Sequence, residues 1–195
     1  MKKIILGSQS PRRKELLENA GIKFEILTAD GEEIVDEKLS FPEIVRSLAI
    51  QKNRQVSENE KCPEDAIVIT ADTMVVCDNC IMGKPKDDND ARRMLKMLSG
   101  NTHLVMTGYC ILDKETGKEV SGVAETEVKF RQLDIDEIDR YIATGEPNDK
   151  AGAYGIQLRA SMFVEGIRGD YFNIVGLPVE RICKLLKEEF NISLL

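Results

Sequence analysis

A stretch near the amino terminus, Gly7-Ser8-Gln9-Ser10-Pro11-Arg12-Arg13, carries hydroxyl and guanidinium groups that could bind a phosphate. An apolar strand is predicted before it and a helix after it, since Ser10 suits an N-cap and Pro11 the first helical position. A helix N-terminus attracts anions, and the forked guanidinium groups of Arg12 and Arg13 match phosphate oxygens. The alternative is a capped helix with solvated arginines. The helix dipole disfavours two cations in the first turn unless an anion binds there, which counts against this alternative.

Carboxylates provide a second set of candidates. Asp72 follows the apolar segment AIVIT, and we expect it at the carboxyl end of a buried strand, where open α/β sheets keep their sites. A turn-capping aspartate is the alternative. Glu32 and Glu33 lie in a predicted loop, and such charge runs are more often solvated surface. Carboxylates close to phosphate-binding bases would suit Mg²⁺ or Mn²⁺, because both ions prefer hard oxygen ligands.

The remaining polar motifs have weaker interpretations. Lys52, Lys84 and Lys150 lie in different predicted elements, and single lysines are usually exposed, so the residues alone give no reason to join them. Cys77-Asp78-Asn79-Cys80 lacks a second CxxC or a nearby histidine and spans a predicted turn, which favours an incidental hairpin. Arg168-Gly169-Asp170 also indicates a tight turn.

The composition excludes several classes of protein. The 195 residues are 42% hydrophobic and 31% charged, with a net charge of -7, so no basic surface for nucleic acid is indicated. No apolar run approaches the roughly 20 residues of a membrane helix, and we expect neither a signal peptide nor a membrane partner. Five scattered cysteines argue against a disulfide framework and favour a cytoplasmic location.

The single histidine, His103, limits the chemistry further. A histidine-rich zinc hydrolase needs more than one, and no G-x-S-x-G segment presents a serine nucleophile. Neither a P-loop nor a G-x-G-x-x-G motif is present. Carboxylates, lysines and arginines must therefore carry any reaction.

These residues are positioned by alternating helices and strands. Strands are predicted at 3–8, 23–28, 66–71, 102–112, 119–130, 162–167 and 171–175, with a hairpin of 73–77 and 81–82 around Asp78-Asn79. Helices are predicted from Pro11 to Gly21, at 42–57, 88–98 and 135–145, and from Pro178 onward. This order predicts a mixed-sheet α/β protein, with one domain over residues 1–195.

Six segments together resemble the Maf family of nucleoside triphosphate pyrophosphatases, once described as septum-formation inhibitors. They follow the order of the family and span nearly the whole chain, which makes the set far more specific than any one segment. They are SQSPRRKELL at 8–17, ITADTMV at 69–75, GKP at 83–85, LSGNTHLVMTG at 98–108, EPNDKAGAYGIQ at 146–157 and GDYFNIVGLP at 169–178.

The resemblance implies an elongated mixed α/β fold, related to inosine triphosphatase-like enzymes, with a deep cleft between two lobes, and usually a homodimer. It implies hydrolysis of the α–β bond of a nucleoside triphosphate with a divalent cation, Mg²⁺ or Mn²⁺. Asp72 of the ADT motif then matches the proton acceptor. Arg13, Thr73 and Gln157 match positions tied to base choice, and Ser8, Arg12, Glu33, Lys52 and Lys84 match further substrate-site positions.

The segment DKAGAYGIQ resembles the dTTP/UTP branch of that family, whereas the branch acting on 7-methyl-GTP differs there. Gln9 departs from the pattern, because a small residue is more usual at that position. The physical interpretation agrees with the resemblance: phosphoryl transfer needs positioning and charge neutralisation, which Arg12, Arg13, Lys52 and Lys84 can supply. Glu33 and Asp72 can hold the metal, and Asp72 can act as general base.

Three alternatives stay open from sequence. One is a regulator of cell division that binds nucleotide without turnover. The second is an inosine or xanthosine triphosphatase with the same reaction and a purine preference. The third is a redox protein that uses Cys77 and Cys80.

Overall fold

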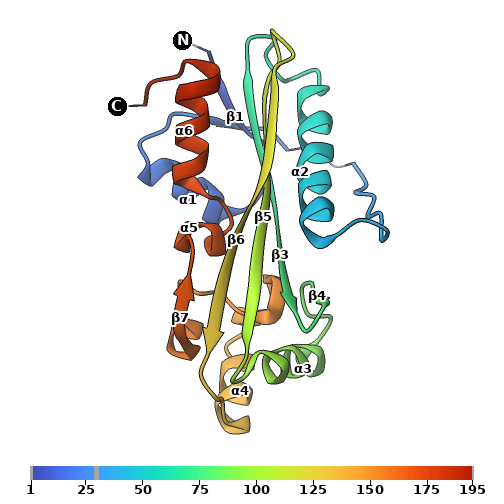
Figure 1. Cartoon of the computed structure of the whole chain (residues 1–195), viewed down its shortest axis with the longest axis vertical. Coiled ribbons are helices and arrows are strands. Elements are labelled where there is room, and N and C mark those ends of the chain that lie inside the picture. The colour runs from blue at the N-terminus through green and yellow to red at the C-terminus, as the bar shows by residue number, and fades with distance from the viewer. Residues whose placement is uncertain (1, 29–30, 195) are drawn as a thin grey trace. The chain divides into compact units, whose positions relative to one another are not determined.

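A computed structural model describes residues 2–28 and 31–194 of the chain (Figure 1). Its strands are β1 (Ile4–Leu6), β2 (Glu25–Ile26), β3 (Ile67–Cys77), β4 (Cys80–Met82), β5 (Thr102–Asp113), β6 (Glu119–Phe130) and β7 (Val164–Arg168). The α-helices are α1 (Pro11–Asn19), α2 (Phe41–Ser57), α3 (Asp88–Leu98), α4 (Ile135–Ile142), α5 (Tyr171–Val175) and α6 (Val179–Phe190). Three short 3₁₀ helices are η1 (Glu146–Asp149), η2 (Ala151–Ala153) and η3 (Arg159–Phe163).

The strands form one seven-stranded sheet in the order β2-β1-β3-β5-β6-β7, with β4 added to β3. β1 is parallel to both β2 and β3, whereas the pairs β3–β4 and β6–β7 are antiparallel. Both parallel and antiparallel pairs are present, so the predicted mixed-sheet α/β fold is confirmed. Within residues 2–28 and 31–194, no helix combines the length and the apolar character needed to cross a bilayer.

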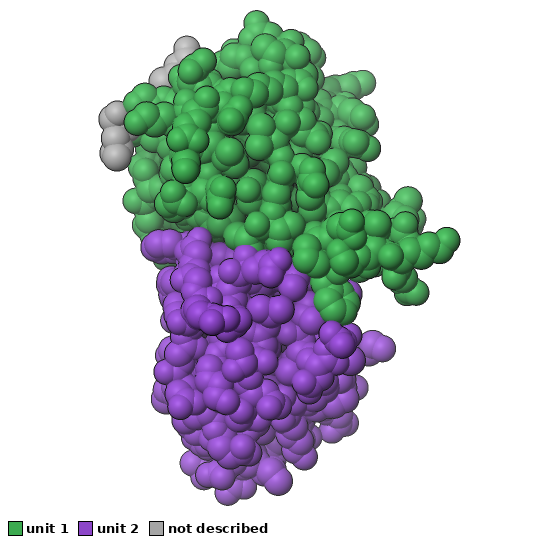
Figure 2. All heavy atoms as spheres, in the orientation of Figure 1, with its two compact units in different colours: residues 1–72, 107–124, 176–195 green, residues 73–106, 125–175 purple. Residues whose placement is uncertain are grey.

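The chain divides into two compact units, coloured separately in Figure 2. Unit 1 comprises residues 1–72, 107–124 and 176–195, and unit 2 comprises residues 73–106 and 125–175. The prediction of one domain over residues 1–195 stays a prediction.

In unit 1 the core forms where β1 and β3 pack with α2. The register pairs Ile4 with Ile67 and Leu6 with Ile69, and these strand residues are buried. A capping box starts α2, since the Ser40 N–H donates to Glu43 Oε2 at 2.9 Å. The buried side chains of this helix recur at helical spacing, at Ile44, Val45, Leu48, Ala49 and Val56.

In unit 2 the core is aromatic and contains the single histidine. Phe130 makes edge contacts with His103, Tyr154 and Phe163. His103 Nε2 lies 2.8 Å from the Tyr154 hydroxyl, and burial lowers the pKa of His103 to about 4. A neutral histidine in this setting serves packing, in keeping with the sequence argument that other side chains carry the chemistry.

The structure corrects the predicted position of Asp72. The two strands predicted at 66–71 and 73–77 are one continuous strand, β3, so Asp72 lies inside this strand and not at its carboxyl end. The extended chain continues because Val75, Val76 and Cys77 pair with β4 through the two-residue Asp78-Asn79 turn. Both turn residues have positive φ, as this tight hairpin requires, which confirms the predicted hairpin.

A second correction concerns residues 171–175, which form helix α5 and not a strand. Asp170 explains the difference, because its Oδ1 accepts the Phe172 N–H at 2.8 Å and so satisfies a donor at the helix start. Where a tight turn is predicted at Arg168-Gly169-Asp170, β7 ends at Arg168 and the chain bends at Gly169, which has φ 131°. Two smaller differences occur elsewhere: the strand predicted at 23–28 shortens to β2, and Ser10 precedes α1 without a side-chain cap.

Cys77, the first cysteine of the Cys77-Cys80 pair, does not have the features of an activated thiol. All five cysteines are free, and Cys77 is buried with its Sγ 3.7 Å from the Met97 carbonyl oxygen. Burial raises the pKa of Cys77, whereas reactive cysteines have a lowered pKa. These observations disfavour the redox alternative.

Candidate active site

Six of the predicted site residues lie in unit 1, where several different elements supply them. Ser8, Arg12 and Arg13 come from the turn before α1 and its first helical turn, Lys52 from α2 and Asp72 from β3; Glu33 lies in the loop before α2. The structure therefore brings together residues that are far apart in the sequence.

The centre of this cluster is the Lys52 ammonium, which lies between two carboxylates. Lys52 Nζ donates to Asp72 Oδ1, and it lies 3.3 Å from Glu33 Oε1. The side chains are 22% exposed for Lys52, 18% for Asp72 and 39% for Glu33. A hydrophilic ligand can thus reach all three groups, while Asp72 is partly withdrawn from water.

Local structure explains the direction of these side chains. Successive residues of a strand point to opposite faces of a sheet, so Asp72 lies on the opposite face from buried Ala71. On α2, Ala49 and Asn53 are fully buried, and Lys52 lies beside this buried stripe. Asn53 Nδ2 donates to the carbonyl oxygens of Val68 and Cys110, at 2.9 and 3.2 Å, which ties α2 to the sheet.

The turn before α1 presents Ser8 and Arg13 together. Ser8 is buried, and its Oγ accepts from the Ser10 N–H and from Arg13 Nη1, both at 3.2 Å. Arg13 Nε donates to the Gly176 carbonyl oxygen at 2.7 Å. The Arg13 guanidinium is therefore held by hydrogen bonds to Ser8 and Gly176, both in unit 1, and it is not free in solvent.

Electrostatics link this turn to the carboxylates. Burial lowers the pKa of Arg13, the Asp72 and Glu33 carboxylates oppose that effect, and the Arg12 charge adds to it. Arg12, Arg13 and Lys52 are three cations against the two carboxylates of Asp72 and Glu33, so the cluster keeps an excess positive charge. Such an excess suits a polyanion, which would neutralise it.

The other predicted residues belong to unit 2. Thr73 is half-buried in β3, Lys84 is exposed between β4 and α3, and Gln157 is exposed in the turn between η2 and η3. Lys150 is buried, with its Nζ donating to the Glu146 carbonyl oxygen at 2.7 Å and to Asp149 at 2.5 Å, which indicates a structural role.

Two glutamines near this cluster have no counterpart among the residues predicted from sequence. Gln51 and Gln55 of α2 bond to the backbone of the loop that carries Glu33. The sequence alone could not distinguish these two residues from solvent-exposed glutamines, which are common on the polar face of an amphipathic helix.

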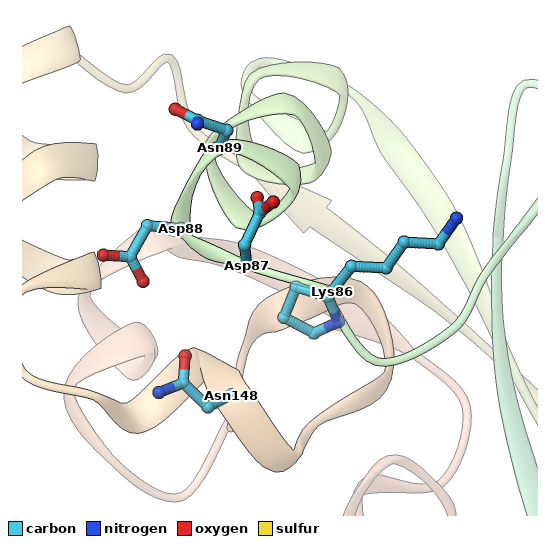
Figure 3. A pocket seen from close by; sticks show the side chains of 6 residues that line it. Lys86, Asp87, Asp88, Asn89 and Asn148 are labelled. Carbon is cyan, nitrogen blue, oxygen red and sulfur yellow. The ribbon is translucent and has the colours of Figure 1, made fainter.

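A separate hollow in unit 2 is lined by Pro85, Lys86, Asp87, Asp88, Asn89 and Asn148 (Figure 3). Asp87 is the N-cap of α3 and accepts the Asp90 N–H at 2.8 Å, so these carboxylates have a structural explanation. None of the predicted site residues lines this hollow.

The unit 1 cluster also fits a divalent cation. Asp72 and Glu33 converge on one positive group, the Lys52 ammonium, which shows that both carboxylates can face a cation. The described part of the chain contains no group of three or more His, Cys, Asp or Glu able to hold a metal ion. Two carboxylates still fit Mg²⁺, which is commonly held by one or two carboxylates plus the phosphates of its substrate.

The comparisons with known proteins first define the fold. The structure is similar to that of a HAM1 protein from Coxiella burnetii, with a TM-score of 0.54 and 16% identity over 96% of this chain and 100% of that one. This likeness assigns the chain to the α/β class with the HAM1 fold.

The family follows from the sequence as a whole. The chain belongs to the family described as "Maf-like protein", whose model matches residues 3–189. It is 51% identical to "dTTP/UTP pyrophosphatase" of Alkaliphilus oremlandii over 195 residues, which is 100% of both chains. It is also 51% identical to "dTTP/UTP pyrophosphatase" of Bacillus cereus over 99% of this chain and 92% of that one. The expected family is confirmed.

Proposed function

We propose that this chain is a nucleoside triphosphate pyrophosphatase that hydrolyses the α–β bond of dTTP and UTP to the nucleoside monophosphate and pyrophosphate. The relatives named dTTP/UTP pyrophosphatase match it over its full length at about half identity. The observation that carries the proposal is the Lys52 ammonium held between Asp72 and Glu33, in a cluster with the guanidinium groups of Arg12 and Arg13.

Each group in the cluster has a task in this reaction. Arg12, Arg13 and Lys52 bind the phosphate oxygens and neutralise the charge that shifts to the leaving pyrophosphate. Ser8 orients the Arg13 fork, since its Oγ accepts from Arg13 Nη1. Asp72 takes a proton from the attacking water, as a general base within hydrogen-bond reach can.

A divalent cation, Mg²⁺ or Mn²⁺, would be held by Glu33 and Asp72 together with the substrate. When bound, it would supply Lewis-acid polarisation of the phosphate oxygens. Lys52 already occupies the space between these carboxylates, so we assign Glu33 mainly to metal binding and Asp72 Oδ2 to proton transfer. This assignment separates metal binding from proton acceptance, because one carboxylate cannot easily be both a tight metal ligand and a strong base.

The substrate roles of Thr73, Lys84 and Gln157 rest on the family resemblance. Thr73 and Gln157 are assigned to base choice with Arg13, and Lys84 to phosphate binding. A homodimer, a cytoplasmic location, one domain over residues 1–195 and the predicted deep cleft belong to the same proposal.

The position of bond cleavage tests the proposal directly. We expect dTTP in ¹⁸O-water to give dTMP and pyrophosphate in equal amounts, with the label in dTMP because water attacks the α-phosphorus. A chelator should stop the reaction, and added Mg²⁺ or Mn²⁺ should restore it. Mass spectrometry of both products is the measurement. Orthophosphate with dTDP, or label in pyrophosphate, would contradict the proposed bond; stoichiometric binding of dTTP without turnover would favour the regulator.

Base choice provides a second prediction, centred on Gln157. Its amide can donate to O4 and accept from N3–H of thymine or uracil, whereas cytosine presents the reverse pattern. Where the bound base excludes water, a mismatched edge leaves polar groups unpaired, at about 1–3 kcal/mol for each group. We therefore expect dTTP and UTP to have a higher kcat/KM than CTP or GTP, and Gln157→Ala to reduce this preference more than kcat.

The matched control is Gln132→Ala, which removes another exposed glutamine of unit 2. The measurement is kcat/KM for dTTP, UTP, CTP, GTP and inosine triphosphate with each variant. A wild-type preference for CTP or a purine nucleotide would overturn the assigned branch. Unchanged ratios in Gln157→Ala would remove Gln157 from base recognition.

A further inference from the structure

The loop that carries Glu33 has little burial to hold it in place. Residues 31–36 form neither helix nor strand, and all are exposed; Figure 1 draws this loop next to α2. Ile34, the residue after Glu33, is 74% exposed. A segment with so few buried contacts depends on hydrogen bonds for its order.

Gln51 of α2 supplies two of these bonds with one side-chain amide. Its Nε2 donates to the Ile34 carbonyl oxygen, and its Oε1 accepts the Ile34 N–H, both at 2.9 Å. Nε2 also donates to Ser47 Oγ at 3.1 Å, which fixes the direction of the amide. The amide thus satisfies both backbone groups of Ile34, in the manner of a neighbouring strand.

Gln55 holds the other side of Glu33. Its Nε2 donates to the Glu32 carbonyl oxygen at 3.2 Å, one helical turn after Gln51. Gly31 permits this approach, because a Cβ there would lie 2.5 Å from the Gln55 amide. The backbone is therefore tied to α2 on both sides of Glu33.

These ties determine where the Glu33 carboxylate lies. Lys52 follows Gln51 on the same helix, and its Nζ lies 3.3 Å from Glu33 Oε1. An exposed ion pair of this kind contributes little by itself, so it cannot hold the loop alone. The Gln51 bonds are shorter and paired, and they are made to the residue next to Glu33.

We propose that Gln51 is a positioning residue, which holds the backbone at Ile34 so that the Glu33 carboxylate faces Lys52 and Asp72. The role of Glu33 in turnover rests on the proposed function, whereas the ordering of the loop by the Gln51–Ile34 hydrogen bonds does not. Gln51 itself contacts none of the proposed catalytic groups through a hydrogen bond; it acts through the loop.

The test compares Gln51→Met with Arg54→Met. Methionine keeps the length of Gln51 and its helix propensity but removes the paired bonds, and Arg54 is an exposed polar residue of the same helix. Hydrogen exchange of the Ile34 amide is measured in the absence of nucleotide. We expect faster exchange in Gln51→Met and the wild-type rate in Arg54→Met.

Kinetics then locate the effect at Glu33. We expect Gln51→Met to lower kcat/KM for dTTP about tenfold, since losing the partner that orients a metal-binding group typically costs about 10–100-fold. In a Glu33→Gln background the same substitution should have little further effect, because the carboxylate it positions is gone. Arg54→Met should match wild type in both backgrounds.

Two results would overturn the positioning role. One is an unchanged Ile34 exchange rate in Gln51→Met. The other is an equal loss from Gln51→Met with and without the Glu33 carboxylate, which would place its effect elsewhere. If wild type releases no pyrophosphate from dTTP, the proposed function fails, and the exchange comparison alone decides whether Gln51 holds the loop.

Discussion

Asp72→Asn is expected to lower the rate of dTTP hydrolysis by at least about 10²-fold, the lower end of general base catalysis. The amide keeps the shape of the side chain but removes the charge that accepts a proton and binds metal. Lys52 keeps Glu33 as a partner 3.3 Å away, so the ammonium is not left unpaired and the fold should persist. The measurement is single-turnover hydrolysis with both proteins at saturating Mg²⁺.

The matched control is Asp113→Asn, which breaks another lysine–aspartate pair of unit 1. Lys2 Nζ lies 2.6 Å from Asp113 Oδ2, and neither residue is among those assigned to catalysis. This control should turn over dTTP at the wild-type rate. A folded Asp72→Asn protein with the same rate as Asp113→Asn would remove Asp72 from the mechanism.

Of the substitutions considered, Gly108→Ala should destabilise the protein most. We expect its free energy of unfolding to fall by about 3 kcal/mol, which is in the upper part of the usual range for overpacking. Gly108 is buried in β5 against α2. A Cβ there would lie 2.2 Å from the Val45 carbonyl oxygen, 2.5 Å from the Val45 carbonyl carbon and 2.7 Å from the Arg46 nitrogen. These are backbone atoms of a helix, so no side-chain rotation can relieve the overlap and α2 must move from the sheet.

The control for this prediction is Gly166→Ala, because a Cβ at Gly166 meets no atom within 4 Å. Urea unfolding of the two variants provides the comparison, with Gly166→Ala close to wild type. Activity of Gly108→Ala should fall as well, because α2 carries Lys52. Equal unfolding midpoints for both variants would mean that α2 packs farther from β5 than the structure shows.

Residue types and motif order led to most of the residues of the candidate cluster in unit 1. The Ser8 to Arg13 segment and the ADT motif are short sequence patterns, and they point to Arg13 and Asp72, whose charges interact in the structure. The environment of Arg13 was not predictable, since its Nε bonds to the Gly176 carbonyl oxygen, a partner from the far end of the chain. Gln51 could not be predicted for the same reason, because its role depends on which backbone lies against α2.

The sequence by itself determined the elements whose signals act within a few residues. These include α3, which the sequence places at the same residues as the structure, and the β3–β4 hairpin, whose Asp78-Asn79 turn tolerates positive φ. Only the tertiary structure decided that β3 continues past Asp72 and that Glu33 and Asp72 share Lys52. The physical reason is the sequence separation over which each interaction acts. Caps and turns involve residues a few positions apart, whereas strand pairing and ion pairs between distant residues depend on how the elements pack.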